Sequence, residues 1–137
     1  GSENVSELHG SIMKSRCSHC GHECEAGAEA WREGLPYCAC GALYRPSVVW
    51  FGEMLPEAAL QRAFTAAETC ALFFSIGTSA VVYPAAALPQ IAREHGAYVV
   101  EINPEPTPLT PIANEFLQGR AGEILPKLTD MIQQVAK

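Results

Sequence analysis

The feature that most constrains this chain is a set of four cysteines arranged in two close pairs. One or two residues separate the thiols within each pair, and 17 residues separate Cys20 from Cys38. Two thiolates at such spacing can fold around a tight turn and hold two corners of a tetrahedron, and a second pair can close the other two. The spacing therefore predicts a zinc ribbon whose ligands are Cys17, Cys20, Cys38 and Cys40.

Disulfide bonds are the alternative use of these cysteines. The tight pairs, the absence of a secretory-signal pattern and two unpaired extras, Cys24 and Cys70, argue for reduced thiols in the cytoplasm. We expect Cys24 and Cys70 to act as small apolar residues. Four protein ligands leave no open position for a bound water, so we expect the zinc to be structural.

The composition describes a globular chain with room for one modest core. Of its 137 residues, 48% are hydrophobic and 18% are charged. No apolar run approaches the about 18–20 residues that span a bilayer. The net charge of −6, without a cluster of Lys or Arg, disfavours nucleic-acid binding. We therefore expect a cytoplasmic protein that binds neither a membrane nor nucleic acid.

Three regions separate along the chain. Residues 1–14 form a lead-in or hinge segment. Residues 15–46 are rich in Cys, Gly and His but lack periodic apolar positions, so we expect a zinc-binding module that folds around its metal. Residues 47–137 alternate strand-like and helix-like segments, which is typical of an α/β fold with a parallel sheet. The expected strands are 48–51, 71–76 and 97–102, and the expected helices are 57–70, 85–95 and 122–136.

The faces of these elements can also be predicted. The strands are apolar at successive positions, which favours a parallel sheet covered on both faces. The segment 103–111, with four prolines, reads as a loop. Helical periodicity places one apolar stripe on the last helix, facing inward: Ile124, Leu125, Leu128, Ile132 and Val135.

Polar residues follow two of the expected strands. Gly77, Thr78 and Ser79 stand between a strand and a helix, where open α/β sheets bind ligands. Backbone N–H groups and hydroxyls there suit phosphate or ribose oxygens, but a plain turn that caps the helix explains them equally well. Asn103 and Glu105 follow the next strand and suit ribose hydroxyls, or else an Asn-Pro turn with a solvated carboxylate.

Four ordered motifs, covering essentially the whole chain, resemble the sirtuins, NAD-dependent protein-lysine deacylases, of the bacterial or class III-like type. The resemblance implies the C-terminal half of a Rossmann-like parallel sheet with an inserted zinc-ribbon module. In the strand order 3-2-1-4-5-6 these strands would be the fourth onward. The motifs are Ser6-Glu7-Leu8-His9-Gly10-Ser11, Arg45-Pro46 with Val48-Val49-Trp50-Phe51-Gly52-Glu53, Gly77-Thr78-Ser79 with Val82-Tyr83-Pro84, and Glu101-Ile102-Asn103-Pro104-Glu105.

Other sirtuin motifs do not stand in this sequence, namely the Gly-rich loop, the Thr-Gln-Asn-Ile-Asp stretch and the catalytic histidine. By the family pattern that base falls just upstream of Gly1, so we assign no catalytic residue and expect His9 to be structural. The resemblance implies a chain that is inactive alone. We expect it to pair with a missing N-terminal half, or to self-associate through the free edge of the strand at 71–76.

The resemblance also implies a site map. NAD+ would be the co-substrate, with ribose at Asn103 and Glu105 and adenine at the backbone of Ala121. Sirtuins usually carry two Cys-x2-Cys pairs, so the fourth zinc ligand stays open, with Cys24, His19 and His22 as competitors. The residues assigned to NAD are Gly77, Thr78, Ser79, Asn103, Pro104, Glu105 and Ala121.

The partner that the resemblance implies is an acyl-lysine peptide or protein. A short apolar segment ending in Gly suits a strand to which a peptide strand can be added, although a core strand explains its Val and Phe. Val49 and Phe51 would line the tunnel for the lysine stem. The residues assigned to the peptide are Val49, Trp50, Phe51, Gly52, Glu53, Val82 and Tyr83.

The implied reaction transfers the acyl group of lysine to ADP-ribose and releases nicotinamide. Burial of the lysine supplies orientation and excludes water. The main alternative is a zinc-ribbon module that binds protein or peptide without catalysis. A zinc hydrolase fits less well, because the metal has no open position.

Overall fold

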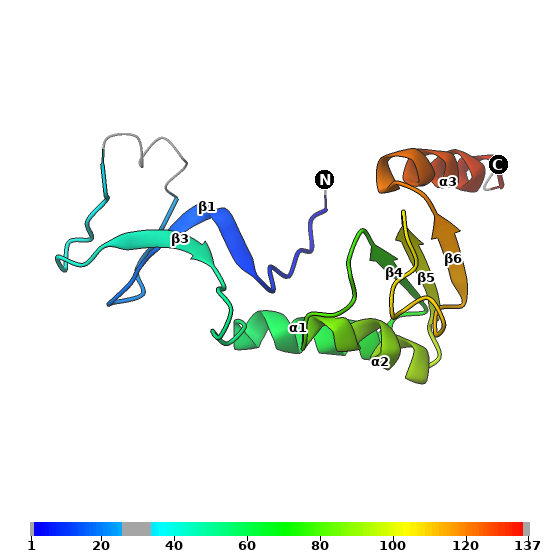
Figure 1. Ribbon diagram of the computed structural model, residues 1–137, viewed down its shortest axis with the longest axis horizontal. Coiled ribbons are helices and arrows are strands. Elements are labelled where there is room, and N and C mark those ends of the chain that lie inside the picture. Colours follow the sequence, from blue (N-terminus) through cyan, green and yellow to red (C-terminus); the bar gives the residue numbers. More distant parts are fainter. Residues whose placement is uncertain (1, 26–33, 136–137) are drawn as a thin grey trace. The chain divides into compact units, whose positions relative to one another are not determined.

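The computed structural model describes residues 2–25 and 34–135, which form two compact units, Gly1–Leu60 and Gln61–Lys137 (Figure 1). Each unit contains a three-stranded sheet. The division expected from the sequence, into 1–14, 15–46 and 47–137, stays a prediction.

The sheet of the first unit is antiparallel, with the order β2-β1-β3. Gly10, at the start of β1, has a φ of +73°, and a Cβ atom there would lie 2.0 Å from the carbonyl oxygen of Ser47. Only glycine therefore allows the two strands to approach this closely. The strands are β1 (Gly10–Cys17), β2 (Glu23–Cys24) and β3 (Tyr44–Val48).

The prediction of a strand at 48–51 is wrong, because the strand lies earlier in the chain, at Tyr44–Val48. The strand ends at Val48, and the next residues form a turn in which the Glu53 N–H donates to the Trp50 carbonyl over 3.0 Å. Gly52, with a φ of +87°, supplies the left-handed residue of this turn. The pattern of Val and aromatic residues continued past the point where backbone pairing stops.

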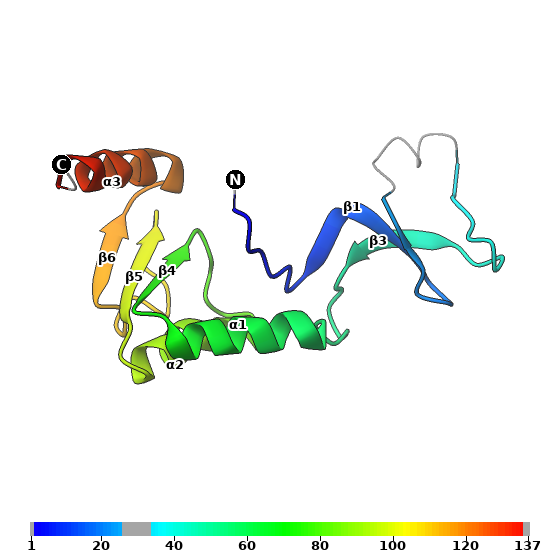
Figure 2. The same cartoon turned by 180° about the vertical axis from the view of Figure 1, so that it is seen from behind.

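The sheet of the second unit is parallel, with the order β4-β5-β6, which confirms the α/β prediction. Figure 2 shows these strands from behind, with α3 above the arrow tips and α2 below the strands in that view. The strand β6 was not expected. The elements are α1 (Glu57–Thr69), β4 (Leu72–Ile76), the 3-10 turn η2 (Ala85–Ala87), α2 (Leu88–Glu94), β5 (Tyr98–Asn103), β6 (Glu115–Gln118) and α3 (Ala121–Val135).

The core of this unit lies where α1 and α2 pack on one face of the sheet, with Ala67, Ala92 and Val99 fully or almost fully buried. The expectation that every strand is covered on both faces is wrong for β4. On its other face Leu72, Phe74 and Ile76 retain 51%, 38% and 40% exposure. Among the described strands β4 pairs only with β5, so it is an edge strand with one open face.

The apolar stripe predicted for the last helix is covered only in its first half. Ile124, Leu125 and Leu128 are partly buried, whereas Ile132 and Val135 are 60% and 88% exposed. The helix contacts β5, and its 15 residues continue past that contact. Residue 136, the predicted helix end, lies outside the described residues. In the described part of the chain, no helix combines the length and apolar character that crossing a bilayer requires.

Candidate functional site

The four cysteines of the two pairs converge in the first unit, with their sulfur atoms within 4.8 Å of one another. Cys17 and Cys40 lie 3.5 Å apart between sulfurs, and Cys20 and Cys38 lie 3.7 Å apart. A tetrahedral zinc with Zn–S bonds of about 2.3 Å separates its sulfurs by roughly 3.8 Å. The cluster therefore fits a four-cysteine zinc site, and none of these cysteines is in a disulfide.

Each pair sits on a tight turn whose backbone N–H groups point at a sulfur. The N–H groups of Cys20 and His19 lower the pKa of Cys17 to about 6. The N–H of Cys40 and the hydroxyl of Tyr44 hold the pKa of Cys38 below its usual range. The two turns therefore favour the thiolate, the form that binds metal, at Cys17 and Cys38. The His22 N–H lowers the pKa of Cys20, but the hydrogen bonds that Cys20 shares with Cys17 and Cys38 raise it overall to about 11.

The shorter second pair closes its turn through Gly41, whose N–H donates to the Cys38 carbonyl over 2.8 Å and whose φ is +86°. Three competitors for the fourth corner, namely Cys24, His19 and His22, stand outside the cluster found in the described residues. Cys24 lies instead on β2, opposite Ser15. The structure thus brings together the four cysteines that the spacing predicted.

The segment assigned to a peptide begins as an extension of the β1–β3 pair and ends in the turn described above. The Val49 N–H still donates to the His9 carbonyl, over 2.9 Å. Beyond it Trp50 is 55% exposed and Phe51 is 100% exposed. Phe51 is therefore not a core side chain, and its contact with a peptide stays a prediction.

The carboxylate of Glu53 closes this turn. It accepts the Trp50 backbone N–H over 3.0 Å and binds the Arg45 guanidinium at 2.6 and 2.8 Å. The Arg45 hydrogen bonds first, and then the Trp50 N–H, hold the pKa of Glu53 below its ordinary value. Arg45 also lies 4.2 Å over the Trp50 ring, so the same guanidinium contacts both ends of the turn.

The remaining peptide residues, Val82 and Tyr83, belong to the second unit and are 45% and 72% exposed. They precede Pro84, after which η2 begins. The two parts of the expected peptide site thus lie in different units, and their joint use stays a prediction.

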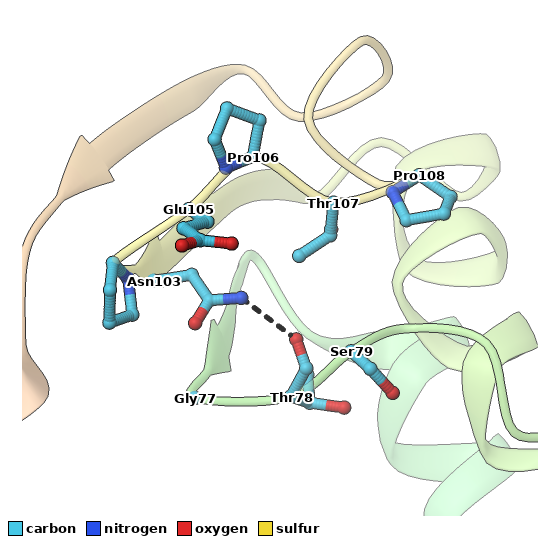
Figure 3. A pocket seen from close by; sticks show the side chains of 9 residues that line it. Gly77, Thr78, Ser79, Asn103, Glu105, Pro106, Thr107 and Pro108 are labelled. Atoms are coloured by element: carbon cyan, nitrogen blue, oxygen red, sulfur yellow. Dashed lines mark hydrogen bonds between the residues drawn. The ribbon is translucent and has the colours of Figure 1, made fainter.

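A pocket of about 430 Å³ opens at the carboxyl ends of β4 and β5 (Figure 3). Gly77, Thr78 and Ser79 form one side, and the loop from Asn103 to Pro108 forms the other. This is the edge at which parallel α/β sheets bind ligands. Six of the seven residues assigned to a dinucleotide therefore line one cavity.

The two sides of the pocket are linked by hydrogen bonds. The side-chain amide of Asn103 donates to the Thr78 carbonyl over 3.0 Å, and the Gly77 N–H donates to the Ile102 carbonyl over 2.9 Å. Ala80, just beyond, has a φ of +53°, a left-handed conformation that non-glycine residues seldom adopt. The strand-to-helix connection is therefore held in a specific and strained shape.

The seventh residue, Ala121, begins α3 and does not line this pocket. The preceding residues attach to the pocket loop, since Gln118 donates to the Pro104 carbonyl over 3.1 Å and the Gly119 N–H donates to the Asn103 carbonyl over 3.0 Å. A contact of Ala121 with adenine stays a prediction.

Sequence reasoning assigned no role to Glu101, which the structure shows to be 1% exposed on β5. Its carboxylate accepts hydrogen bonds from the hydroxyls of Thr107 and Thr110, the latter at 2.6 Å. Both threonines belong to the loop that follows the strand, so Glu101 anchors that loop from beneath. The available signal was a carboxylate in the middle of an otherwise apolar strand.

The sequence is similar to a known protein family and to proteins with assigned names. A model of the Sir2 family matches residues 1–84. A Pyrococcus furiosus protein named NAD-dependent protein deacylase is 49% identical over 143 residues, covering 100% of this chain and 57% of that protein. NAD-dependent protein deacylase 1 of Pseudomonas aeruginosa is 47% identical over 143 residues, covering 93% of this chain and 54% of that protein.

Solved structures show the same likeness. A Sir2 homolog in complex with NAD superposes with a TM-score of 0.95 at 46% identity, covering 100% of this chain and 54% of that one. A Sir2 protein bound to a propionylated peptide superposes with a TM-score of 0.87 at 33% identity, covering 96% and 57%. The chain spans about half the length of the curated relatives that it matches.

Proposed function

The chain belongs to the Sir2 family, and from this premise we propose that it contributes the dinucleotide pocket and a peptide-binding turn to an NAD-dependent protein-lysine deacylase. The observation that carries the proposal is the single pocket formed by Gly77–Ser79 and Asn103–Glu105 at two parallel strand ends. The NAD complex of a similar Sir2 protein supports this use of the pocket.

Within the pocket we assign the polar contacts to NAD as follows. The Asn103 nitrogen is held by the Thr78 carbonyl, so its side-chain oxygen is left to accept a ribose hydroxyl. The Glu105 carboxylate can accept a second one. The hydroxyls of Thr78 and Ser79 are exposed and suit phosphate or ribose oxygens. When bound, NAD supplies an electrophilic ribose carbon and nicotinamide as leaving group.

For the acyl-lysine peptide we assign Trp50, Phe51 and the backbone of the turn, together with Val82 and Tyr83. Exposed apolar side chains can cover the aliphatic stem of a lysine and exclude water around it. A Sir2 relative bound to a propionylated peptide supports an acylated peptide as the partner. The four cysteines would hold zinc in a structural role, because all four corners are protein ligands.

We propose separately where the general base of the reaction comes from and which partner covers β4. No histidine lines the pocket in the residues that the structure describes. We therefore assign the base to a sirtuin N-terminal half, which would pack against the exposed face and edge of β4. Pairing of two copies of this chain at the same edge is the competing arrangement.

The test is an activity and binding assay on the 137-residue chain. It is incubated with NAD and an acetyl-lysine peptide, with and without the N-terminal half of the Pyrococcus furiosus relative, and nicotinamide release is followed. We expect release only in the mixture, with NAD bound in a calorimetric titration. Peptide binding that is indifferent to NAD, without nicotinamide release in the mixture, would point instead to an interaction module.

A further inference from the structure

Two arginines on neighbouring strands share one carboxylate beside the peptide turn. Arg16 on β1 and Arg45 on β3 are directly opposite each other in the antiparallel register. Glu53 binds the Arg45 guanidinium at 2.6 Å and the Arg16 guanidinium at 2.9 Å. The carboxylate therefore joins both strands to the turn that follows β3.

Without Glu53, the opposed Arg16 and Arg45 side chains would destabilise the β1–β3 pair. Like charges placed directly opposite each other in an antiparallel pair destabilise it. The Arg45 side chain is only 15% exposed, so its charge needs a close partner. The Glu53 carboxylate reduces the repulsion between the two arginines and gives Arg45 its close partner. The Trp50 ring covers the Arg45 guanidinium at 4.2 Å.

The arginine pair also adjoins the metal site. Arg16 immediately precedes the ligand Cys17, and the next pair in the register is Cys17 with Tyr44. On the other side, the Glu53 oxygen that binds Arg16 also accepts the Trp50 N–H over 3.0 Å. A continuous set of contacts thus runs from a metal ligand to the turn that exposes Phe51.

We propose that Glu53 is a positioning residue that couples the metal site to the peptide turn. The metal holds the end of the β1–β3 pair, the pair aligns the two arginines, and the arginines orient Glu53 and with it Trp50 and Phe51. The coupling rests on the proposed function only in taking this turn as the surface that meets the peptide. Because coupling is reciprocal, loss of Glu53 must also loosen the metal.

The first experiment measures zinc release from the zinc-loaded chain into excess chelator. Glu53→Gln should release zinc about fivefold faster, at the low end of typical coupling between sites. Because the substitution also removes a negative charge, which by itself favours loss of a dication, Glu53→Asp is measured beside it: it keeps the charge on a side chain one methylene shorter, and it should also release zinc faster than the wild type. Glu7→Gln is the matched control, since it breaks the exposed pair between Glu7 and Lys14 of β1 and should leave the rate unchanged.

The second experiment measures hydrogen exchange of the Trp50 amide, which donates to the Glu53 carboxylate, with zinc bound. Glu53→Gln and Arg16→Lys should both speed exchange, because Arg16→Lys keeps the charge but loses the guanidinium geometry. If Glu53→Gln does not fold, Glu53→Asp, one methylene shorter, takes its place. Release and exchange at wild-type rates in a folded Glu53 variant would overturn the proposal.

A third arm separates this coupling from the proposed function. An acetyl-lysine peptide, added with NAD and the N-terminal half of a relative, should slow zinc release from the wild type and not from Glu53→Gln. Faster release from Glu53→Gln with no effect of peptide on the wild type would sustain the coupling and count against the turn as a peptide site. Equal slowing in both proteins would refute the coupling and retain the peptide site.

Discussion

The side-chain amide of Asn103 reaches the backbone carbonyl of Thr78 over 3.0 Å and joins the ends of β4 and β5 (Figure 3). The bond uses only the nitrogen of the amide. It therefore orients the oxygen of Asn103 while it fixes the width of the pocket. Asn103 thus links the two strand ends and, under the proposed function, presents its oxygen to NAD.

Replacing Asn103 should weaken NAD binding more than it lowers stability. Asn103→Ala removes one hydrogen bond to ligand and one internal strut, worth roughly 0.5–1.5 kcal/mol each. We expect the NAD concentration for half-saturation to rise about tenfold, measured by calorimetry with the N-terminal half of a relative present. Asn114→Ala is the control, since Asn114 accepts the Val99 N–H away from the pocket and should lower the melting temperature without changing NAD affinity. Equal affinity in wild type and Asn103→Ala would contradict the assignment.

Glu101 should matter to both stability and NAD binding. Glu101→Gln keeps the shape but leaves one of two threonine hydroxyls facing an N–H₂ group, which typically costs about 1–3 kcal/mol in a buried site. We expect a lower melting temperature and weaker NAD binding, because the loop at 103–108 loses its anchor. Glu105→Gln, on the exposed rim, should weaken NAD binding alone. Unchanged melting of Glu101→Gln would show that the carboxylate is dispensable.

Each chain should hold one tightly bound zinc. Structural zinc sites carry about 10–16 kcal/mol of apparent binding free energy, comparable to the entire stability of a domain. Cys17→Ser should release the metal and unfold the described module around it, whereas Cys24→Ser, outside the cluster, should do neither. Metal analysis and circular dichroism measure the two effects. Wild-type protein purified without chelator and found free of zinc would refute the site.

Phe51→Ala should change peptide recognition without changing stability. The side chain is 100% exposed, so its removal creates no cavity and the melting temperature should stay within error. Loss of a Phe that becomes buried against a ligand costs about 1.5–3 kcal/mol, so we expect the KM for an acyl-lysine peptide to rise roughly tenfold or more while that for NAD is unchanged. A parallel rise in both constants would mean that the turn is not specific to the peptide.

The exposed edge of β4 should make the isolated chain self-associate or bind an N-terminal half. Phe74 faces solvent on this edge strand and is 38% exposed. Phe74→Lys should keep the chain monomeric at concentrations where the wild type does not, as measured by size-exclusion chromatography with light scattering. Met131→Lys, also exposed but on α3, is the matched control and should leave association unchanged.

The parts of this molecule that depend on local pattern were predictable. Two runs of apolar residues ending in Gly77 and Asn103 indicated β4 and β5, and their polar successors converged in the structure as parallel strands require. The metal ligands were equally local, because each pair sits on its own turn. The strand β6 was missed, since Glu-Phe-Leu-Gln carries no β-branched residue and is a strand through its pairing with β5.

The turn at Trp50–Glu53 could not be predicted from local pattern. Val48, Val49, Trp50 and Phe51 have high strand propensity, and the sequence alone indicated a strand. The pairing with β1 ends first, and an ion pair between Arg45 and Glu53, together with Arg16 from far along the chain, closes the turn. Such a contact carries no periodicity, so no pattern in the sequence could reveal it. Glu101 differs, because a carboxylate inside an apolar strand was a visible signal; only its partners, Thr107 and Thr110, six and nine residues away in a loop, could not be predicted.

Pro46 has a consequence for how the length of the β1–β3 pair can vary among homologous chains. The register with β1 passes from Ser11–Ser47 to Ser15–Pro46, so three residues of β1 bulge out opposite a residue that has no N–H to offer. The bulge separates the end of the β1–β3 pair at Gly10 from the end at Cys17, and its Ile12 and Met13 are 75% and 65% exposed. Insertions or deletions in homologous chains are therefore best tolerated at residues 12–14, where added or lost length shifts neither the thiolates nor the turn.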